Sequence, residues 1–257
     1  MYSDLFCRQA VFPVLFPVLA LLCGASSCSV KEDREDCPCA LYVKLENLPA
    51  APVTVILTGE DYREEHLALG DTVLLVRPPK SGVTLQAVAG ASMEPDDRME
   101  IPYGFDSPPV YLYQDQVDTA ADSTSVTVLL HKHFCNLSIR FDGPKGWGEP
   151  YWTEVRGPVD GILWDGTPTE GPFSCRLDDG LTVRLPRQLP DQVLLLDITL
   201  PDQVVRTFDL GYYLEQAGFD WTLPDLEDRT LEINLSVTAL VLRIDNWSTV
   251  VPLEIVI

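Results

Sequence analysis

Residues 126–141 read VTVLLHKHFCNLSIRF, a stretch dominated by β-branched, aliphatic and aromatic side chains. Side chains of these kinds favour extended backbone. The stretch is too long for one typical strand, which has about 5–6 residues. We therefore expect it to bend near Lys132 or to serve two neighbouring β-sheet units.

The residues before this stretch alternate between apolar and polar side chains, with breaks at Pro, Gly, Asp and Asn. Alternation with period two places the apolar side chains on one face of a strand. Strands are expected at Leu41–Leu45, Val53–Leu57, Thr72–Val76, Val83–Ala89 and Tyr111–Tyr113. We expect a loop at Pro95–Pro109 and a polar linker at Asp118–Ser125.

The residues after the stretch continue the same pattern. Strands are expected at Phe173–Leu177, Thr182–Leu185, Val193–Leu200, Val204–Phe208, Leu231–Val237, Leu240–Ile244 and Val250–Ile257. The segments Gly143–Gly148 and Gly157–Gly171 are expected to be turns, because Gly and Pro are the strongest local breakers of regular structure.

One short helix is predicted among the later strands. Asp209 is a good N-cap for Leu210–Ala217, and Gly218 supplies a left-handed stop. The whole pattern predicts an all-β fold class: two β-sandwich domains, with the helix in the second. We place the N-terminal sandwich at residues 40–122 and the C-terminal sandwich at residues 123–257.

The first residues of the chain are expected to lie outside the fold. The apolar segment Val11–Cys23 is too short for a membrane-spanning helix, which needs about 20 residues. The small residues at 25–27 followed by Cys28 resemble a bacterial lipobox, in which the thiol is acylated and the peptide is cut just before it. We therefore expect a lipoprotein signal peptide at residues 1–27 and a tether at residues 28–39. The alternative is an ordinary signal peptide cut near Ala25.

The composition limits the possible partners. The chain has 257 residues, 46% of them hydrophobic, which suffices for a packed core. Its formal net charge is -21. A strongly acidic protein is repelled by nucleic acid and by anionic lipid, so neither is expected as a partner.

Four cysteines remain in the expected mature chain after Cys28. They are disulfide candidates, because an exported protein can form disulfides. The four are Cys37, Cys39, Cys135 and Cys175. Their spacing leaves three pairings open, and a bond from Cys37 or Cys39 to Cys135 or Cys175 is favoured over the strained ring between the first two. The Cys37–Cys39 spacing lacks the two-residue gap of a zinc knuckle.

No motif for chemistry is found. The chain has no Gly-x-Ser-x-Gly elbow, and none of His66, His131 and His133 lies in a recognisable catalytic motif. His131 and His133 are two residues apart and could share a strand face, but no other histidine is near. We expect no catalytic residue, no metal and no cofactor.

Two further surface features are expected from short patterns. Trp147, Trp152 and Trp164 could form a platform for carbohydrate, or they could pack in the core and seal loops. Three Asp-Ser/Thr-small triplets are typical of O-glycosylation in Bacteroidetes. They place possible glycans on Thr72, Thr119 and Ser123.

Several segments, read in order, resemble the FimB/Mfa2 family of Bacteroidetes fimbrial anchor lipoproteins. The first is the acidic opening Lys31–Cys39 behind the lipobox. The others are Leu130–Phe134, Leu185–Gln188, Gly218–Trp221, Asp225–Asp228 and Ile244–Trp247. Phe219 stands where the family usually has Tyr.

The resemblance implies two transthyretin-like sandwiches and a lipid on Cys28 that holds the protein on the cell outer membrane. It also implies a fimbrial (pilin) subunit as partner, joined by strand addition. The apolar end of the chain is a candidate contact strand, through Val250, Val251, Leu253, Ile255 and Ile257. It could equally be the last strand of its own sandwich, with Pro252 at a sheet edge. The alternative functions are a surface glycan-binding lipoprotein and, with no motif to support it, an exported hydrolase.

Overall fold

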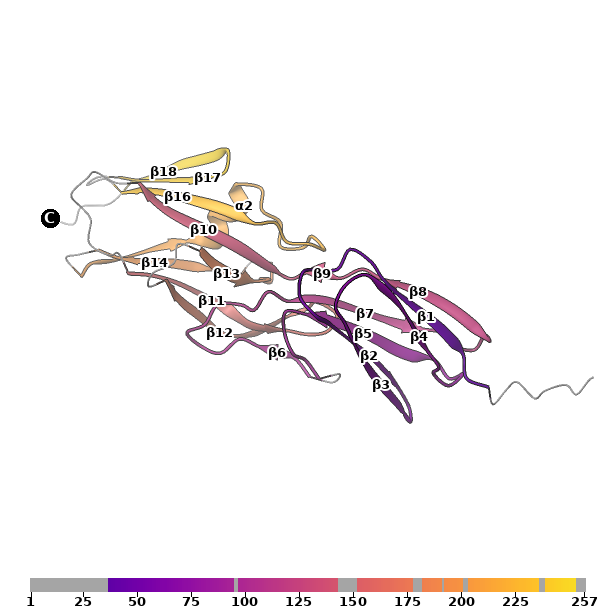
Figure 1. Cartoon of the computed structure of the whole chain (residues 1–257). Helices are drawn as coiled ribbons and strands as arrows, with labels where there is room; N and C mark the ends of the chain where they lie inside the picture. Colours follow the sequence, from indigo (N-terminus) through magenta and orange to yellow (C-terminus); the bar gives the residue numbers. More distant parts are fainter. Residues whose placement is uncertain are drawn as a thin grey trace, which may run out of the picture. The chain divides into compact units, whose positions relative to one another are not determined.

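The computed structural model describes residues 37–94, 97–142, 152–177, 182–190, 192–200, 203–235 and 239–252. The chain divides into two units, Met1–Cys37 and Pro38–Ile257, so the fold is that of the second unit. Its described part consists of β-strands and one short helix (Figure 1). This confirms the predicted all-β fold class.

The first strands form two sheets. Their bounds are β1 (Ala40–Leu45), β2 (Val53–Gly59), β3 (Tyr62–Ala68), β4 (Thr72–Val76), β5 (Val83–Ala89), β7 (Tyr111–Val117), β8 (Ser123–Val128) and β9 (His131–Lys132). One sheet has the order β4-β1-β8 and the other the order β3-β2-β5-β7-β9. Strands β1 and β8 are parallel, and the other pairs are antiparallel. A hydrophobic core lies between the sheets, and β1 shows the predicted alternation.

The sheet β3-β2-β5-β7-β9 contributes to two cores. Val55 and Leu57 of β2 belong to the core shared with β1, whereas Ile56, between them, belongs to the core of the later strands. Val88 of β5 and Leu112 of β7 also join that second core. Strands buried on both faces are enriched in apolar residues, and β2 carries the run Val55–Leu57 and β5 the run Ala87–Ala89.

The later strands form two further sheets around the second core. Their bounds are β10 (Phe134–Asp142), β11 (Trp152–Ile162), β12 (Pro168–Leu177), β13 (Thr182–Pro186), β14 (Leu195–Thr199), β15 (Val205–Asp209), β16 (Arg229–Leu235), β17 (Ala239–Ile244) and β18 (Trp247–Pro252). One sheet has the order β13-β10-β16-β17-β18 and the other β12-β11-β14-β15. The transthyretin-like topology implied by the resemblance stays a prediction.

The helix α2 (Leu210–Gln216) confirms the prediction made from its caps. The Asp209 side chain accepts a hydrogen bond from Tyr212 N at 3.0 Å. Gly218 follows with φ +82°, and Phe219 N bonds back to Leu214 O at 3.0 Å. Leu214 is buried in the second core. Among the described residues, no helix is long and apolar enough to span a bilayer.

Residues 126–141 do not form one strand, and the stretch is interrupted on both sides of β9, close to Lys132, where a bend was expected. They are divided among the end of β8, the two-residue strand β9 and most of β10, so the stretch serves three sheets. Because β8 pairs with β1, Ser123–Val128 lies in a sheet with the first strands. The boundary between the two sandwich domains at residues 122/123 stays a prediction. The pairing of β8 with β1 favours a domain boundary after Val128.

The linker prediction for Asp118–Ser125 is wrong. Thr119 is fully buried; its hydroxyl donates to Pro79 O at 2.6 Å and accepts from Gly82 N at 2.9 Å. From Ser123 onward the chain is already in β8. Thr119 thus satisfies two backbone groups of the 79–82 segment, and the residues from Ser123 onward belong to a strand.

The turn prediction for Gly157–Gly171 is also wrong, because β11 and β12 cover most of it. The strands pair antiparallel, with register shifts between Gly157 and Val159 and between Val159 and Gly161. Gly161 is needed for close approach: a Cβ there would lie 2.3 Å from Met99 O. Met99 belongs to the short strand β6 (Met99–Glu100), which pairs with β11 inside the loop expected at Pro95–Pro109.

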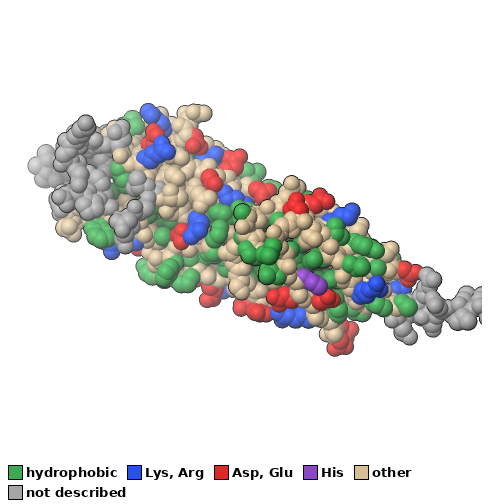
Figure 2. Space-filling view, in the orientation of Figure 1, with side chains coloured by type: hydrophobic (Ala, Val, Ile, Leu, Met, Phe, Trp, Pro, Cys, Tyr) green, Lys and Arg blue, Asp and Glu red, His purple; other side chains and the backbone are tan. Residues whose placement is uncertain are grey.

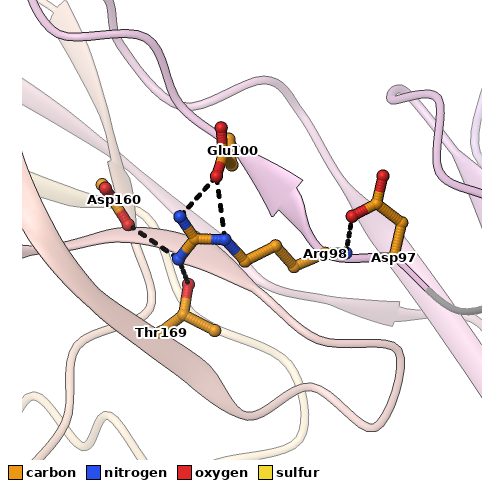
Figure 3. Close-up of polar contacts among 5 residues, drawn as sticks. All are labelled: Asp97, Arg98, Glu100, Asp160 and Thr169. Atoms are coloured by element: carbon orange, nitrogen blue, oxygen red, sulfur yellow. Dashed lines mark hydrogen bonds and ion pairs between the residues drawn. The ribbon is translucent and has the colours of Figure 1, made fainter.

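Arg98 holds β6 against β11 and β12 (Figure 3). Its Nη1 donates to Thr169 Oγ1 at 3.1 Å and to Asp160 Oδ1 at 3.4 Å. Its Nε donates to Glu100 Oε1 at 2.9 Å, and Nη2 donates to the same oxygen. Gly171 makes room for this cluster, because a Cβ there would overlap the Asp160 carboxylate.

We expect Gly161→Ala to destabilise the protein by about 1–3 kcal/mol, because the added methyl group overpacks the β6–β11 contact. The measurement is the free energy of unfolding from a denaturant titration. Gly59→Ala is the matched control, since its Cβ would lie 3.5 Å or more from every neighbour. Equal stabilities of the two variants would contradict the close-approach role of Gly161.

Candidate functional site

Arg187 is buried at a point where several of the segments that carry the family resemblance meet. Its Nε donates to His133 Nδ1 at 3.1 Å. Its Nη1 donates to Trp221 O and to Leu223 O, the latter at 2.7 Å. Its Nη2 donates to Pro224 O at 2.9 Å and makes a longer contact of 3.5 Å with Lys132 O. All five N–H groups of the guanidinium therefore have acceptors.

Two carboxylates fasten the following segment to the same place. Asp225 accepts from Lys132 N at 2.8 Å, and its other oxygen lies 3.3 Å from His131 Nδ1. Asp228 accepts from Lys132 Nζ at 2.5 Å and from Asn136 N at 2.7 Å. Segments 131–136, 187 and 221–228 thus form one polar cluster, which we call the Arg187 cluster.

The electrostatics of the cluster favour a neutral imidazole beside a buried cation. Burial lowers the pKa of His133 to about 4, and the neighbouring Arg187 charge acts in the same direction. Burial also lowers the pKa of Arg187, while Asp225 and Asp220 oppose that shift. With Nδ1 accepting from Arg187, the single proton of neutral His133 is on Nε2.

A cavity of about 570 Å³ adjoins the cluster. It is lined from five segments: Leu112–Gln114 on β7, His131 and His133, the turn Trp164–Pro168 between β11 and β12, Arg187–Pro190, and Trp221–Pro224. A volume of this size lies in the range of ligand pockets. Its lining residues come from positions 112 to 224 of the chain and are brought together by the fold, so we take it as the candidate site.

The structure does not form the predicted tryptophan platform among the residues it describes. Trp164 is 5% exposed, and its Nε1 donates to Glu94 O at 2.7 Å. Trp152 is 43% exposed, but the guanidinium carbon of Arg176 lies 3.4 Å from its ring centroid. Trp147 lies outside the described residues. Trp164 therefore packs in the second core, as the alternative prediction had it.

The predicted disulfide is absent from the structure, in which no bond joins any two of the four candidate cysteines. Cys39 is buried, Cys135 and Cys175 are buried in the second core, and Cys37 is exposed. Burial raises the pKa of the Cys135 thiol to about 12, so this side chain behaves as a small apolar core residue.

The remaining predicted positions are scattered. The pair His131 and His133 lines the cavity, and in the described part of the chain no group of three or more ligating residues is placed to hold a metal ion. Thr72 and Ser123 are exposed, and their glycosylation stays a prediction. Burial of Thr119 argues against a glycan there. Cys28 lies outside the described residues.

The predicted contact strand begins inside β18. Val250 and Val251 pair with Val241 and Leu240 of β17, so they belong to the protein's own sheet. Strand β18 is an edge of that sheet, as Pro252 indicated, and Val250 is 62% exposed. Leu253, Ile255 and Ile257 lie outside the described residues. The role of these five residues in subunit contact stays a prediction.

Charged side chains of both signs lie on the surface. Figure 2 shows acidic and basic side chains interspersed over the visible face, with hydrophobic side chains between them. Several carboxylates of the described residues are paired with arginines, such as Asp106 with Arg184 at 3.0 Å. Interspersed charge of this kind favours solubility over binding to a polyanion or polycation.

Neither Arg187 nor Arg98 was expected from the sequence to be a functional or structural centre. Arginine is normally exposed, so burial of its guanidinium is not expected from residue type. The available signal was position: Arg187 lies in a Pro-Arg-Gln turn directly after a predicted strand, and Arg98 lies in an acidic loop.

The fold is similar to those of several solved bacterial proteins. A protein described as an adhesin from Bacteroides ovatus superposes with a TM-score of 0.63 at 12% sequence identity, over 83% of this chain and 95% of that chain. The fimbrial anchor protein Mfa2 from Porphyromonas gingivalis superposes with a TM-score of 0.60 at 13% identity, over 82% and 99%. A protein from Bacteroides thetaiotaomicron described as polysaccharide-binding gives 0.63 at 13% identity, over 84% and 98%.

No protein-family model and no curated protein matches the sequence. At these identities, what the chain shares with the solved structures is the fold. The fold is shared with a fimbrial anchor protein over most of both chains, as the resemblance in the sequence implied.

We expect the stability of the protein to fall by about 3 kcal/mol as the pH drops from 6.5 to 4, through His133 alone. In this window the unfolded chain binds a proton at His133 and the folded protein does not, so acid favours unfolding. The measurement is the free energy of unfolding against pH. His133→Gln should flatten the dependence, and His66→Gln is the control; equal slopes for wild type and His133→Gln would contradict the burial of a neutral imidazole.

Proposed function

We propose that the chain is a lipid-anchored protein of the cell outer membrane that attaches a fimbrium to the cell surface. The observation that carries the proposal is the fold, shared with the fimbrial anchor protein Mfa2 over 82% of this chain and 99% of that one. The lipobox-like residues ending at Cys28 supply the membrane attachment, and residues 28–39 the tether. The protein has a structural role and no catalytic one.

The partner in this proposal is a fimbrial (pilin) subunit that adds a strand to an open sheet edge. Strand addition needs unpaired backbone groups and side chains at alternate positions that fit the partner. Strand β18 meets the first need within the described part of the chain, where β17 is its one strand neighbour. Its exposed Val250 offers an apolar contact at the same edge.

The finer details of attachment rest on the resemblance to fimbrial anchors. The lipid on Cys28 would place the protein on the outer membrane, exposed at the cell surface. A protein at the base of a fibre also contributes to setting its length, because the fibre ends where the anchor binds. The chain's acidic character suits this location, since it keeps neighbouring copies apart.

We expect Cys28→Ala to release the protein from the outer membrane, because the thiol that carries the lipid is lost. The measurement is membrane fractionation, with mass spectrometry of the mature N-terminus. Cys37→Ala is the matched control, since it removes an exposed thiol a few residues further along. An unmodified N-terminus cut near Ala25 in the wild type would contradict the proposed lipid anchoring through Cys28.

We expect Val250→Lys to weaken retention of fimbriae, because a charged side chain on an edge strand opposes strand addition. The measurement is the fraction of fimbriae shed into the medium, compared with the folded fraction of the variant. Val205→Lys is the matched control, because Val205 is 56% exposed on β15, an edge of the other sheet. Normal retention in a folded Val250→Lys protein would exclude β18 as the docking edge.

A further inference from the structure

Strand β4 forms an apolar, uncharged edge of the sheet β4-β1-β8 (Figure 1). Its sequence is TVLLV, and β1 is its one strand neighbour in the described part of the chain. Val73 is 56% exposed and Leu75 is 50% exposed. Proteins normally protect such an edge, because its free backbone groups and apolar side chains accept a strand from another chain.

The neighbouring edge of the other sheet around the first core shows this protection. Strand β3 carries Arg63, Glu64 and Glu65, and charged side chains on an edge strand oppose strand addition. Arg63 is also held by an ion pair with Glu94 at 2.9 Å. Strand β4 has no charged residue, so we expect a partner to cover its edge.

The apolar surface continues from this edge onto the outer face of the sheet. Leu75 is paired with Tyr42 of β1, and Val73 is paired with Lys44. Side chains at alternate positions of a strand share a face, so these four lie on one face. Tyr42 and Lys44 are exposed, whereas the residues between and beside them on β1 are buried in the first core. The shared face is therefore the one that points away from the core.

Charge is distributed unevenly along the edge. Asp71 directly precedes β4 and Glu46 directly follows β1, so two exposed carboxylates lie at the same end of this antiparallel pair. At the other end, Arg77 is exposed and forms no ion pair within the described part of the chain. An edge that is acidic at one end and basic at the other is complementary to an antiparallel copy of itself.

We propose that β4 pairs antiparallel with β4 of a second copy of the chain. In the register centred on Leu74, Val73 lies opposite Leu75 of the second copy, and Asp71 lies opposite its Arg77. The arrangement is two-fold symmetric, so each of these contacts forms twice. The two sheets become one continuous sheet, in which the free backbone groups of both edges are paired. This contact is separate from the edge at β18 and goes beyond fimbrial attachment.

The net charge of the chain restricts how two copies can meet. A charge of -21 repels most orientations of the pair. This repulsion is screened beyond about 8 Å at physiological ionic strength, so it matters most where carboxylates come close together. The residues of β4 carry no charge, and the flanking charges are of opposite sign across the contact. Because the strand is short, the contact is small, and the dimer is expected to form only where copies are concentrated.

The test is sedimentation equilibrium of the purified full-length protein in a density-matched detergent, over a range of protein concentrations. We expect the wild type to be in equilibrium between monomer and dimer. Val73→Lys places a charge on the exposed edge and should raise the dimer Kd about tenfold or more. Thr127→Lys is the matched control, because Thr127 is exposed on β8, at the opposite edge, and both Val73 and Thr127 pair with Lys44. It should associate as the wild type does.

A charge exchange tests the register. Arg77→Asp puts two carboxylates opposite each other and should weaken the dimer. Adding Asp71→Arg makes the facing charges opposite again and should restore association, which a change in net charge alone would not do. Asp71 also accepts from Asn47 N at 3.2 Å and from Leu48 N at 3.1 Å, so the folded fraction of each variant is measured in parallel.

A folded wild type that stays monomeric at every concentration would overturn the proposal, as would unchanged association in a folded Val73→Lys protein. A monomeric wild type combined with reduced retention of fimbriae in Val73→Lys would assign the edge to a fimbrial subunit instead. A glycan on Thr72 of the natural protein would also overturn the proposal, because Thr72 lies opposite Val76 of the second copy. The dimer measurement depends neither on β18 nor on the lipid at Cys28.

Discussion

The guanidinium of Arg187 is buried without a carboxylate in contact with it among the described residues, and the surrounding structure depends on how its five donors are satisfied. Four backbone carbonyls and one imidazole nitrogen surround it. Removing an ion from water is costly unless its hydrogen bonds are replaced. The segments that supply these acceptors are therefore constrained to one geometry, which also sets the walls of the cavity and the position of His133.

A second constraint is the close approach of backbones at glycine. Gly161 lets β6 pair with β11, and Gly171 leaves space for the carboxylate that Arg98 contacts. The short strand β6 comes from a loop between strands of the first sheets, yet it extends a sheet of the second core. Glycine here acts through its missing side chain, which differs from its usual role in turns.

Much of the fold could be predicted from local pattern, because a strand with one buried face must alternate. This held for β1, and the caps alone located α2. Strand β3 was not predicted, because its sequence YREEHLA is that of a charged edge. The cavity was not predictable in this way. Its lining residues span positions 112–224, and nothing in the neighbours of Arg187 along the chain reveals that it is buried.

The sheet β3-β2-β5-β7-β9 lies against hydrophobic side chains on both faces, so each core uses it as a wall. Melting the second core alone would expose Ile56, Val88 and Leu112 to water. Melting the first core alone would expose the side chains on the opposite faces of the same strands. The free energy of one core is therefore linked to that of the other. The consequence is cooperativity: the region from β1 to β18 should unfold in one transition, although its sequence reads as two successive units.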